Sequence, residues 1–415
     1  MKRIVAFFIC ISLAAAVYAE GTKITFMNSK GEIQSQLEEA AKLFEKENPG
    51  ISVELLAAPV GQSPWEKVMA LYAAGNAPTL FMDKITSILK VKDKLADLSS
   101  ERWVKDIIPT PAMDLATPGG KVIAFPVTVE GYGIIYNRSL LNKAGIDPQS
   151  IKTVKDLDSA CRKLQAAGIG AVVVAKDDWS VGGHFLYTGY AQSKNQVGWE
   201  AMQADLKAGK IDLDKNEAFN GLLDTFDLLK KYNINAKDPM SPSYDNVNMQ
   251  FASGKAAFYF QGNWVWPLLS KLTQDTHFGF LPVPVANDPG AYGNSGIPLG
   301  ITKFIAIDAE QNTKEQQAAA KKFLEWLVYS PVGQDVIVNK YSIIPAFRNI
   351  ALMPKDPLSQ SIIKDYIAKD RTIFWPQTPS DHWAKLGIPM QKYLANVIKR
   401  DELLKEIEDY WKKVK

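Results

Sequence analysis

The chain has 415 residues, of which 47% are hydrophobic and 22% carry charged side chains. This length is enough for a large hydrophobic core and exceeds one ordinary domain, so two lobes are expected. The 48 Lys and Arg residues nearly balance the 45 Asp and Glu residues, which leaves a formal net charge of +3. Because the chain is nearly neutral and has no basic run interleaved with aromatic residues, the sequence argues against a nucleic-acid partner.

The first residues have the pattern of a secretory signal peptide. The basic pair Lys2-Arg3 precedes an apolar stretch over residues 4–17, and a Val-Tyr-Ala sequence ends at Ala19. The apolar stretch is shorter than the roughly 20 residues that a membrane-spanning helix needs. We therefore predict that residues 1–19 are a signal peptide cut after Ala19 and that the mature protein is periplasmic.

The two cysteines are consistent with an exported protein that has no internal disulfide. Cys10 lies inside the predicted signal peptide, and it follows Ile9 where a lipoprotein cysteine would follow a small residue. Cys161 then remains as the single cysteine of the mature chain and cannot form an internal disulfide. The fold is therefore expected to be stabilised by its hydrophobic core.

The mature chain alternates short apolar runs with stretches of helical apolar spacing. In chain order, the first expected elements are a strand over 23–27, a helix over 33–44, a strand over 51–56, a helix over 65–74, and strands over 79–82, 122–125 and 132–136. Then come helices over 139–143 and 154–167, a strand over 169–174, a mostly helical region over 181–232, a helix ending at 249–253, strands from about 256 and over 278–281 and 301–307, a helix over 315–329, and helices from about 358. This alternation predicts an α/β fold.

Two stretches are predicted to connect the lobes as hinges. They are residues 127–131 and residues 292–300, the second of which ends a segment rich in Pro and Gly. Because the two stretches lie far apart in the sequence, each lobe is expected to be built from discontinuous segments that can open and close on a ligand. The predicted N-terminal lobe comprises residues 20–128 and 298–350, and the predicted C-terminal lobe comprises residues 129–297 and 351–415.

The sequence contains no pattern typical of an enzyme. His184, His277 and His382 are scattered, and there is no HExxH motif, Cys/His cluster, P-loop, GxSxG motif or dinucleotide-binding motif. Asp177 and Asp178 are adjacent, and neighbouring side chains of an extended chain point apart, which favours a loop or helix N-cap over a glycosidase pair. No metal, cofactor or catalytic residue is therefore expected.

Tryptophan rings in turns are candidate ligand contacts. Sugars expose apolar CH faces that stack on flat rings, while polar groups at the rim of a site bind their hydroxyl groups. Trp199 and Trp326 lie at helical spacing and are expected to pack in the core. Five other tryptophans occupy turns beside polar residues: Trp65, Trp179, Trp264, Trp375 and Trp383. Ligands of open α/β sheets gather beyond the C-terminal ends of strands, where such turns lie, so these five are predicted to bind the ligand.

The sequence FYFQGNWVW over residues 258–266 shows this pattern most clearly. A strand is predicted to end at Gly262, which permits a tight turn, and Asn263 is predicted to cap the following helix. Trp264 is then expected to point into a cleft between the lobes, and Trp266 is expected to pack in the core.

Five motifs follow one another along the mature chain: LEEAAKLFEKENPGISVEL (37–55), AAGNAPTLF (73–81), GGKVIAFPVTVEGYGIIYNRSLLNKAGI (119–146), FASGKAAFYFQGNWVW (251–266) and AAKKFLEWLVYSPVGQ (319–334). Together they resemble the family 1 extracellular solute-binding proteins of ABC importers, of the maltose-binding-protein-like, carbohydrate type. The resemblance implies a two-lobed, periplasmic-binding-protein-like α/β fold of type II, with discontinuous lobes joined by hinge crossovers. It also implies a monomer that binds a mono- or oligosaccharide and delivers it to the membrane subunits of an ABC permease.

The resemblance further implies roles for individual polar residues. Lys30 matches a ligand-contacting loop after the first strand, and Asp83 falls near a polar contact of the same lobe. Glu130 matches a carboxylate that accepts hydrogen bonds from sugar hydroxyl groups. The family often has Pro-Asp after its alanine-glycine turn, whereas residues 77–79 read Ala-Pro-Thr, so any role of that aspartate is lost.

Three tryptophans also match aromatic positions of the family. Trp264 matches the stacking tryptophan of its G-x-W motif, and Trp179 and Trp383 match aromatic residues of the C-terminal lobe. Trp65 and Trp375 are predicted as ligand contacts from their position in turns alone.

The residues alone leave two other functions open. A secreted glycoside hydrolase would need two carboxylates about 5–10 Å apart, and Glu130 has no evident second carboxylate in the sequence. A binding protein for a charged solute such as a polyamine would need several acidic groups, which Glu130 and Asp83 could begin to supply.

Overall fold

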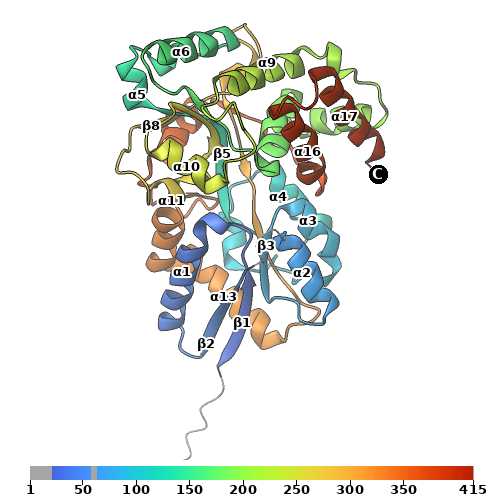
Figure 1. The fold of residues 1–415 in the computed structure, drawn as a ribbon. Coiled ribbons are helices and arrows are strands. Elements are labelled where there is room, and N and C mark those ends of the chain that lie inside the picture. Colours follow the sequence, from blue (N-terminus) through green and yellow to red (C-terminus); the bar gives the residue numbers. More distant parts are fainter. Residues whose placement is uncertain (1–20, 58–62, 415) are drawn as a thin grey trace, which may run out of the picture.

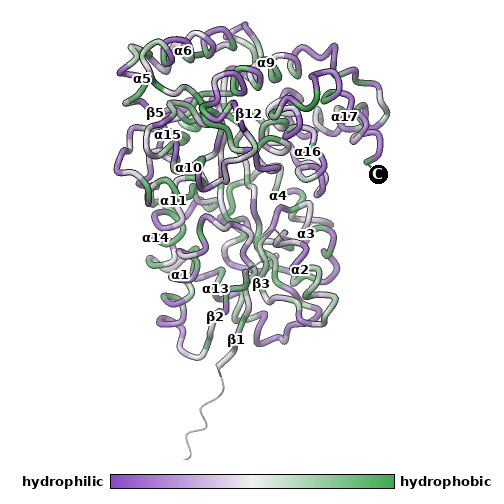
Figure 2. The backbone as a smooth tube through the Cα atoms, in the orientation of Figure 1, coloured by the Kyte–Doolittle hydropathy of each residue, from purple (hydrophilic) through white to green (hydrophobic). Residues whose placement is uncertain are grey.

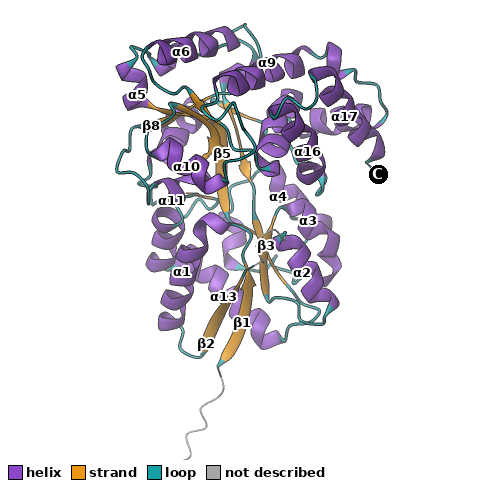
Figure 3. Cartoon of the chain, in the orientation of Figure 1, coloured by secondary structure: helices purple, strands orange, loops and turns teal. Residues whose placement is uncertain are grey.

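The computed structural model describes residues 21–57 and 63–414, which form two lobes stacked along one axis (Figure 1). The predicted signal peptide, residues 1–19, lies outside the described residues. Each lobe is built around its own β-sheet, with helices on the outside (Figure 3). No helix in the described ranges has both the length and the apolar character needed to cross a membrane.

The first lobe contains a sheet with the strand order β2-β1-β3-β10-β4. Its strands are β1 (Thr22–Met27), β2 (Ile51–Leu56), β3 (Leu80–Asp83), β4 (Phe125–Pro126) and β10 (Phe304–Ile307). β1 is parallel to β2 and β3, whereas β10 is antiparallel to β3 and β4. The main helices of this lobe are α1 (Gln34–Glu47), α2 (Pro64–Ala73), α3 (Ile85–Ile88), α4 (Pro111–Leu115), α13 (Lys314–Tyr329) and α14 (Pro331–Asp335).

The second lobe contains a sheet with the main strand order β12-β9-β5-β7-β6, and β8 and β11 also pair with β5. Its strands are β5 (Thr128–Asn137), β6 (Val172–Val173), β7 (Phe258–Gly262), β8 (Phe278–Leu281), β9 (Ile297–Ile301), β11 (Ile344–Pro345) and β12 (Thr372–Ile373). Its helices include α5 (Arg138–Lys143), α6 (Val154–Ala166), α7 (Leu186–Tyr190), α8 (Gln196–Lys207), α9 (Glu217–Tyr232), α10 (Tyr244–Ala252), α11 (Trp266–Leu269), α12 (Tyr292–Ser295), α15 (Pro357–Ser361), α16 (His382–Leu394) and α17 (Arg400–Lys413). The α/β prediction is confirmed.

The two predicted hinge stretches lie on or beside strands that pair with each other. β5 begins at Thr128 and β9 ends at Ile301, and the two strands pair antiparallel with Glu130 opposite Gly300. The predicted hinge at 127–131 is thus largely strand, because its backbone groups pair with a segment distant in sequence. The chain changes sheet at Val127, at Thr302-Lys303, and again between β10 and β11. The lobe boundaries given above stay a prediction.

The apolar residues concentrate on the strands and on the inner faces of the helices (Figure 2). Trp326 packs between Phe44 and Phe323, and its indole N–H donates a hydrogen bond of 2.7 Å to Glu47. Trp199 is 1% exposed, and its ring lies 5.1 Å from that of Tyr190. The prediction that these two tryptophans pack in the core is confirmed.

Candidate functional site

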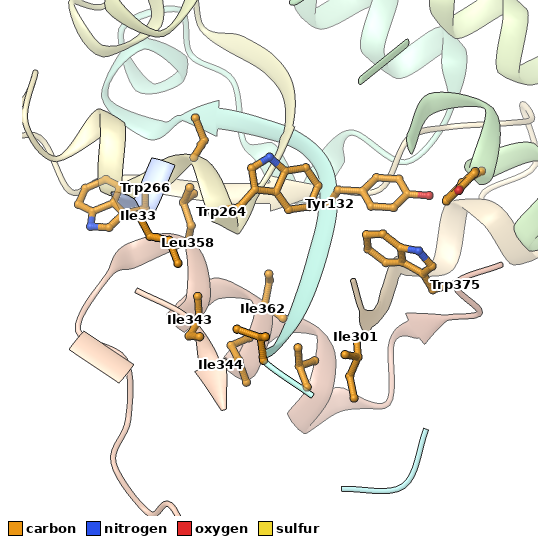
Figure 4. Packing of buried hydrophobic residues seen from close by; sticks show 14 of the residues in the cluster. Ile33, Tyr132, Trp264, Trp266, Ile301, Ile343, Ile344, Leu358, Ile362 and Trp375 are labelled. Atoms are coloured by element: carbon orange, nitrogen blue, oxygen red, sulfur yellow. The ribbon is translucent and has the colours of Figure 1, made fainter. Parts of the chain in front are cut away.

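Six aromatic rings from five segments of the second lobe meet close to the junction of the lobes. Three of the segments directly follow strands β6, β7 and β12, and the others are β5 and α16. We call this set the site ring group; its members are Tyr132, Trp179, His184, Trp264, Trp375 and Trp383. Figure 4 shows Tyr132 between Trp264 and Trp375.

His184 lies at the centre of the site ring group. The centre of its ring is 4.7 Å from that of Trp264, 5.2 Å from Tyr132, 5.3 Å from Trp383, 5.4 Å from Trp375 and 5.9 Å from Trp179. Four of the five tryptophans predicted from turns are thus brought together by one side chain that the sequence did not single out.

Trp264 is positioned by the glycine that precedes it, for a different reason from the one predicted. Gly262 has an extended backbone with φ of −112°, so no left-handed turn is needed. A Cβ atom at this position would lie 2.1 Å from the Trp264 ring, which folds back over the glycine. Gly262 is therefore required for space. Trp266 points away from Trp264 in Figure 4 and packs against Phe278 at 6.0 Å, which confirms its predicted place in the core.

The prediction that Asn263 caps a helix is wrong. Its side-chain oxygen accepts a hydrogen bond of 3.1 Å from the backbone N–H of Gly131, and its amide nitrogen donates to the Ser359 hydroxyl at 3.2 Å. The buried N–H of Gly131 needs an acceptor, and Asn263 is the residue beside β5 that supplies one. Asn263 therefore joins β7 to β5 and α15.

Trp383 is held in place by close packing and by one hydrogen bond. A Cβ atom on Gly182 would lie 2.3 Å from the backbone of Gly387, so these glycines let α16 approach the segment that contains His184. The indole N–H of Trp383 then donates to the Tyr187 hydroxyl at 2.6 Å. Asp178 accepts a hydrogen bond of 2.7 Å from the backbone N–H of Trp179, which confirms the predicted N-cap.

A buried ion pair joins Lys30, which follows β1 in the first lobe, to Glu130 on β5. Lys30 Nζ is 2.7 Å from Glu130 Oε1 and 2.8 Å from Glu32 Oε1. The Thr302 hydroxyl donates to the second carboxylate oxygen of Glu130. Burial opposes the charge on Lys30, but Glu130 and Glu32 outweigh it and raise the pKa of Lys30 above its ordinary value. Lys30 therefore stays protonated and neutralises Glu130.

A second set of charges reaches the rings from the end of β3. Asp83 is buried, lies 3.7 Å from the Lys303 ammonium, and accepts a hydrogen bond of 2.6 Å from the backbone N–H of Lys84. The Lys84 ammonium lies 4.1 Å from the centre of the Trp383 ring, so a residue of the first lobe covers a ring of the second. Burial lowers the pKa of Lys84 to about 8, and the nearby Asp83 offsets part of this effect.

Among the predicted site residues, Trp65 lies apart from the others. It is half-buried on α2 in the first lobe, where its ring packs 6.3 Å from Phe81. Within the described residues it makes no ring contact with the site ring group. Its role as a ligand contact stays a prediction.

Several residues of the site were missed from the sequence: Tyr132, His184, Tyr187, Lys84 and Thr302. Tyr132 has a signal that could have found it, because it lies two residues after Glu130 and side chains two apart share one face of a strand. Thr302 and Lys84 lie beside strand ends, which is a weaker signal.

The chemistry of this arrangement suits binding. Flat rings can stack on an apolar face of a ligand, and neutralised charged groups can hydrogen-bond to hydroxyl groups at its edge. Within the described residues, no group of three or more His, Cys, Asp or Glu residues is arranged to hold a metal ion.

The chain is similar to known binding proteins over most of its length. The sequence profile of the family "Bacterial extracellular solute-binding protein" matches residues 39–365. The melibiose/raffinose/stachyose-binding protein MelE of Bacillus subtilis is 24% identical over 304 residues, which cover 68% of this chain and 68% of MelE.

Solved structures show the same fold. The solute-binding protein RafE in complex with raffinose has a TM-score of 0.78 and 20% identity, covering 94% of this chain and 99% of that one. The apo form of RafE from Streptococcus pneumoniae has a TM-score of 0.67 and 20% identity, covering 95% and 98%.

The expected two-lobed fold is confirmed by these structures, and the expected absence of enzymatic activity agrees with a family of binding proteins. The profile match covers far more than half of the chain. The chain is a member of the bacterial extracellular solute-binding protein family.

Proposed function

We propose that the protein is the substrate-binding protein of an ABC sugar importer, which binds a mono- or oligosaccharide between its lobes and delivers it to the permease. Membership of the solute-binding family supports the binding role, and the sugars named for MelE and RafE support a carbohydrate ligand. The observation that carries the proposal is the site ring group beside the Lys30–Glu130 pair at the junction of the lobes.

In this mechanism the apolar faces of the sugar stack on indole rings, and its hydroxyl groups bind the polar side chains of both lobes. Contacts from both lobes favour the closed form, so the ligand shifts the population towards the form that the permease recognises. The proposed ligand-contacting residues are Lys30, Trp65, Asp83, Glu130, Trp179, Trp264, Trp375 and Trp383. We further propose that the protein acts as a periplasmic monomer after removal of its signal peptide.

The two alternative functions are less well supported by the geometry. A glycoside hydrolase needs a carboxylate free to act, but the two oxygens of Glu130 are bonded to Lys30 and Thr302. A polyamine would meet the ammonium groups of Lys30, Lys84 and Lys303, whose positive charges lower the pKa of the His184 ring. A neutral sugar avoids both difficulties.

A thermal-shift screen tests the proposal directly. The panel contains raffinose, melibiose, maltose and monosaccharides, with spermidine and amino acids as controls. A sugar present well above its dissociation constant should raise the melting temperature by mass action. A shift with spermidine but with no sugar would contradict the proposal, and release of new reducing ends from the oligosaccharides would favour the hydrolase.

A further inference from the structure

His184 has no role in the set of ligand contacts proposed above, although it touches four of them. It lies in a π-helical turn over Trp179–Phe185. Such wide turns bring residues five positions apart onto one face, and they occur frequently at functional sites. This turn presents Trp179 and His184 together to the rings of Trp264, Trp375 and Trp383.

The imidazole of His184 carries an unsatisfied nitrogen in this buried position. The side chain is 6% exposed, and its Nδ1 atom has no hydrogen-bond partner within the described residues. The Trp179 carbonyl lies near enough to favour a proton on the ring, but it does not meet hydrogen-bond geometry. Buried polar side-chain atoms are ordinarily paired. Nδ1 of His382 is unpaired as well, but that ring is bonded to Tyr190 through Nε2, whereas no side-chain hydrogen bond holds the ring of His184 within the described residues, so His184 points to a partner from outside the chain.

The charge of the ring limits what that partner can be. Burial, reinforced by the ammonium groups of Lys30, Lys303 and Lys84, lowers the pKa of His184 to about 3. The ring is therefore neutral at any ordinary pH, so one of its nitrogens can donate a hydrogen bond and the other can accept one. A hydroxyl group both donates and accepts, so it suits either nitrogen.

We propose that His184 is a specificity-determining residue that hydrogen-bonds one hydroxyl group of the bound sugar at the centre of the site ring group. This inference rests on the proposed function, because it takes a sugar as the ligand. If His184 served only to fill space among the rings, a phenyl ring in its place would serve equally well.

Two variants separate these possibilities. His184→Phe keeps an aromatic ring and removes both nitrogens, whereas His184→Asn keeps a donor and an acceptor close to Nδ1. By titration calorimetry with raffinose, maltose and any other sugar that the wild type binds, we expect His184→Phe to lose about tenfold or more in affinity. His184→Asn should recover part of this loss. The matched control is His382→Phe, because His382 is also buried among rings but bonds Tyr190 at 3.1 Å.

The outcomes are distinct. If the wild type binds a sugar and His184→Phe binds it equally tightly, His184 only packs and the inference is wrong. If the wild type binds no sugar of the panel, the proposed function fails and the inference falls with it. Should His184→Phe not fold, nitrogen-15 NMR of the wild-type imidazole decides: a shift of a ring nitrogen on sugar addition supports the inference, and an unchanged signal overturns it.

Discussion

The second lobe contains two neighbouring groups of rings, each with a buried histidine, and they differ in how their polar atoms are satisfied. We call the second the core ring group; it consists of Tyr190, Trp199, His382, Tyr410 and Trp411. Here the indole N–H groups of Trp411 and Trp199 donate to the Tyr190 hydroxyl at 3.0 Å and to the Gln377 carbonyl at 2.8 Å. His382 is also bonded to Tyr190.

In the site ring group the Tyr132 hydroxyl and the Nδ1 atom of His184 have no hydrogen-bond partner among the described residues, whereas in the core ring group Nδ1 of His382 lacks one but both tyrosine hydroxyl groups are bonded. Lys84 from the other lobe also lies over Trp383. Both groups are buried and closely packed, so burial does not separate a binding site from a core. The unpaired Tyr132 hydroxyl and the nearby charges do distinguish the site ring group from the core ring group.

The largest effect should come from the core ring group. Trp411→Ala removes a fully buried ring, and we expect it to lower the free energy of unfolding by about 3–5 kcal/mol. Sugar affinity of the folded fraction should not change, because Trp411 lies outside the site ring group. Urea denaturation and calorimetry measure the two quantities. A loss of affinity as large as that of a site variant would remove the distinction between the groups.

The next effect concerns the ion pair beside the site ring group. Glu130→Gln removes a charged acceptor, and loss of a hydrogen bond to a charged group should weaken sugar binding by about 1.5–3 kcal/mol. Calorimetry with a sugar found in the screen measures this change. Glu54→Gln is the control, since Glu54 forms an exposed pair with Lys23. Equal affinities of both variants would contradict the role of Glu130.

Removing a ring of the site should act on affinity more than on stability. We expect Trp264→Ala to weaken sugar binding by about 1–3 kcal/mol, the loss of one stacked and desolvated ring. Trp266→Ala, two positions further on, should instead reduce stability and leave affinity unchanged, because Trp266 packs against Phe278. The prediction fails if a folded Trp264→Ala variant binds sugar as tightly as the wild type.

The smallest effect should be a pH dependence caused by Lys84. Burial lowers the pKa of Lys84 from its ordinary value of 10.5 to about 8 in the folded protein. Between these pH values the unfolded chain binds more protons, so the free energy of unfolding rises with pH. Relative to Lys84→Met, the wild type should therefore gain stability from pH 8 to pH 10.5, and the difference should be constant below pH 8. Parallel denaturation curves across this range check the result; a flat difference would show that Lys84 is not desolvated.

The fold could be predicted from the sequence where the signals are local. The helix expected over 154–167 is α6 (Val154–Ala166), which begins at a capping box formed by Thr153. The helix expected over 315–329 is α13 (Lys314–Tyr329), which begins in the same way at Thr313. Cap residues and apolar spacing lie within a few positions of each other, so these elements need no knowledge of the rest of the chain.

The connection between the lobes could not be predicted in this way. The single strand expected over 301–307 is two strands, β9 and β10, which belong to different sheets. Pro and Gly near residues 292–300 indicated a linker, but β9 is a strand because it pairs with β5 more than 150 positions earlier. Such pairing depends on contacts that no local pattern reports.

The candidate site could be predicted only in part, because many of its contacts also join residues that are far apart in the sequence. Trp179, Trp264 and Trp383 could be identified from turns and from the family resemblance, and they do meet in the structure. His184 could not be identified in this way. A single histidine outside any motif gives no local signal, and its place in the site depends on contacts with rings from four other segments. Asn263 was misassigned because its bonding partners, Gly131 and Ser359, are far away in the sequence.

Gly131 separates Glu130 from Tyr132 on β5, the strand through which the lobes are connected. A Cβ atom there would lie 3.1 Å from the side chains of Ile297 and Ile362, so the backbone at this point is closely enclosed. Any bending of β5 at Gly131 must therefore reorient a carboxylate and an aromatic ring at the same time. Ligand affinity and the rate of lobe movement should accordingly vary together in variants of this glycine, although residue 131 itself has no side chain with which to touch a sugar.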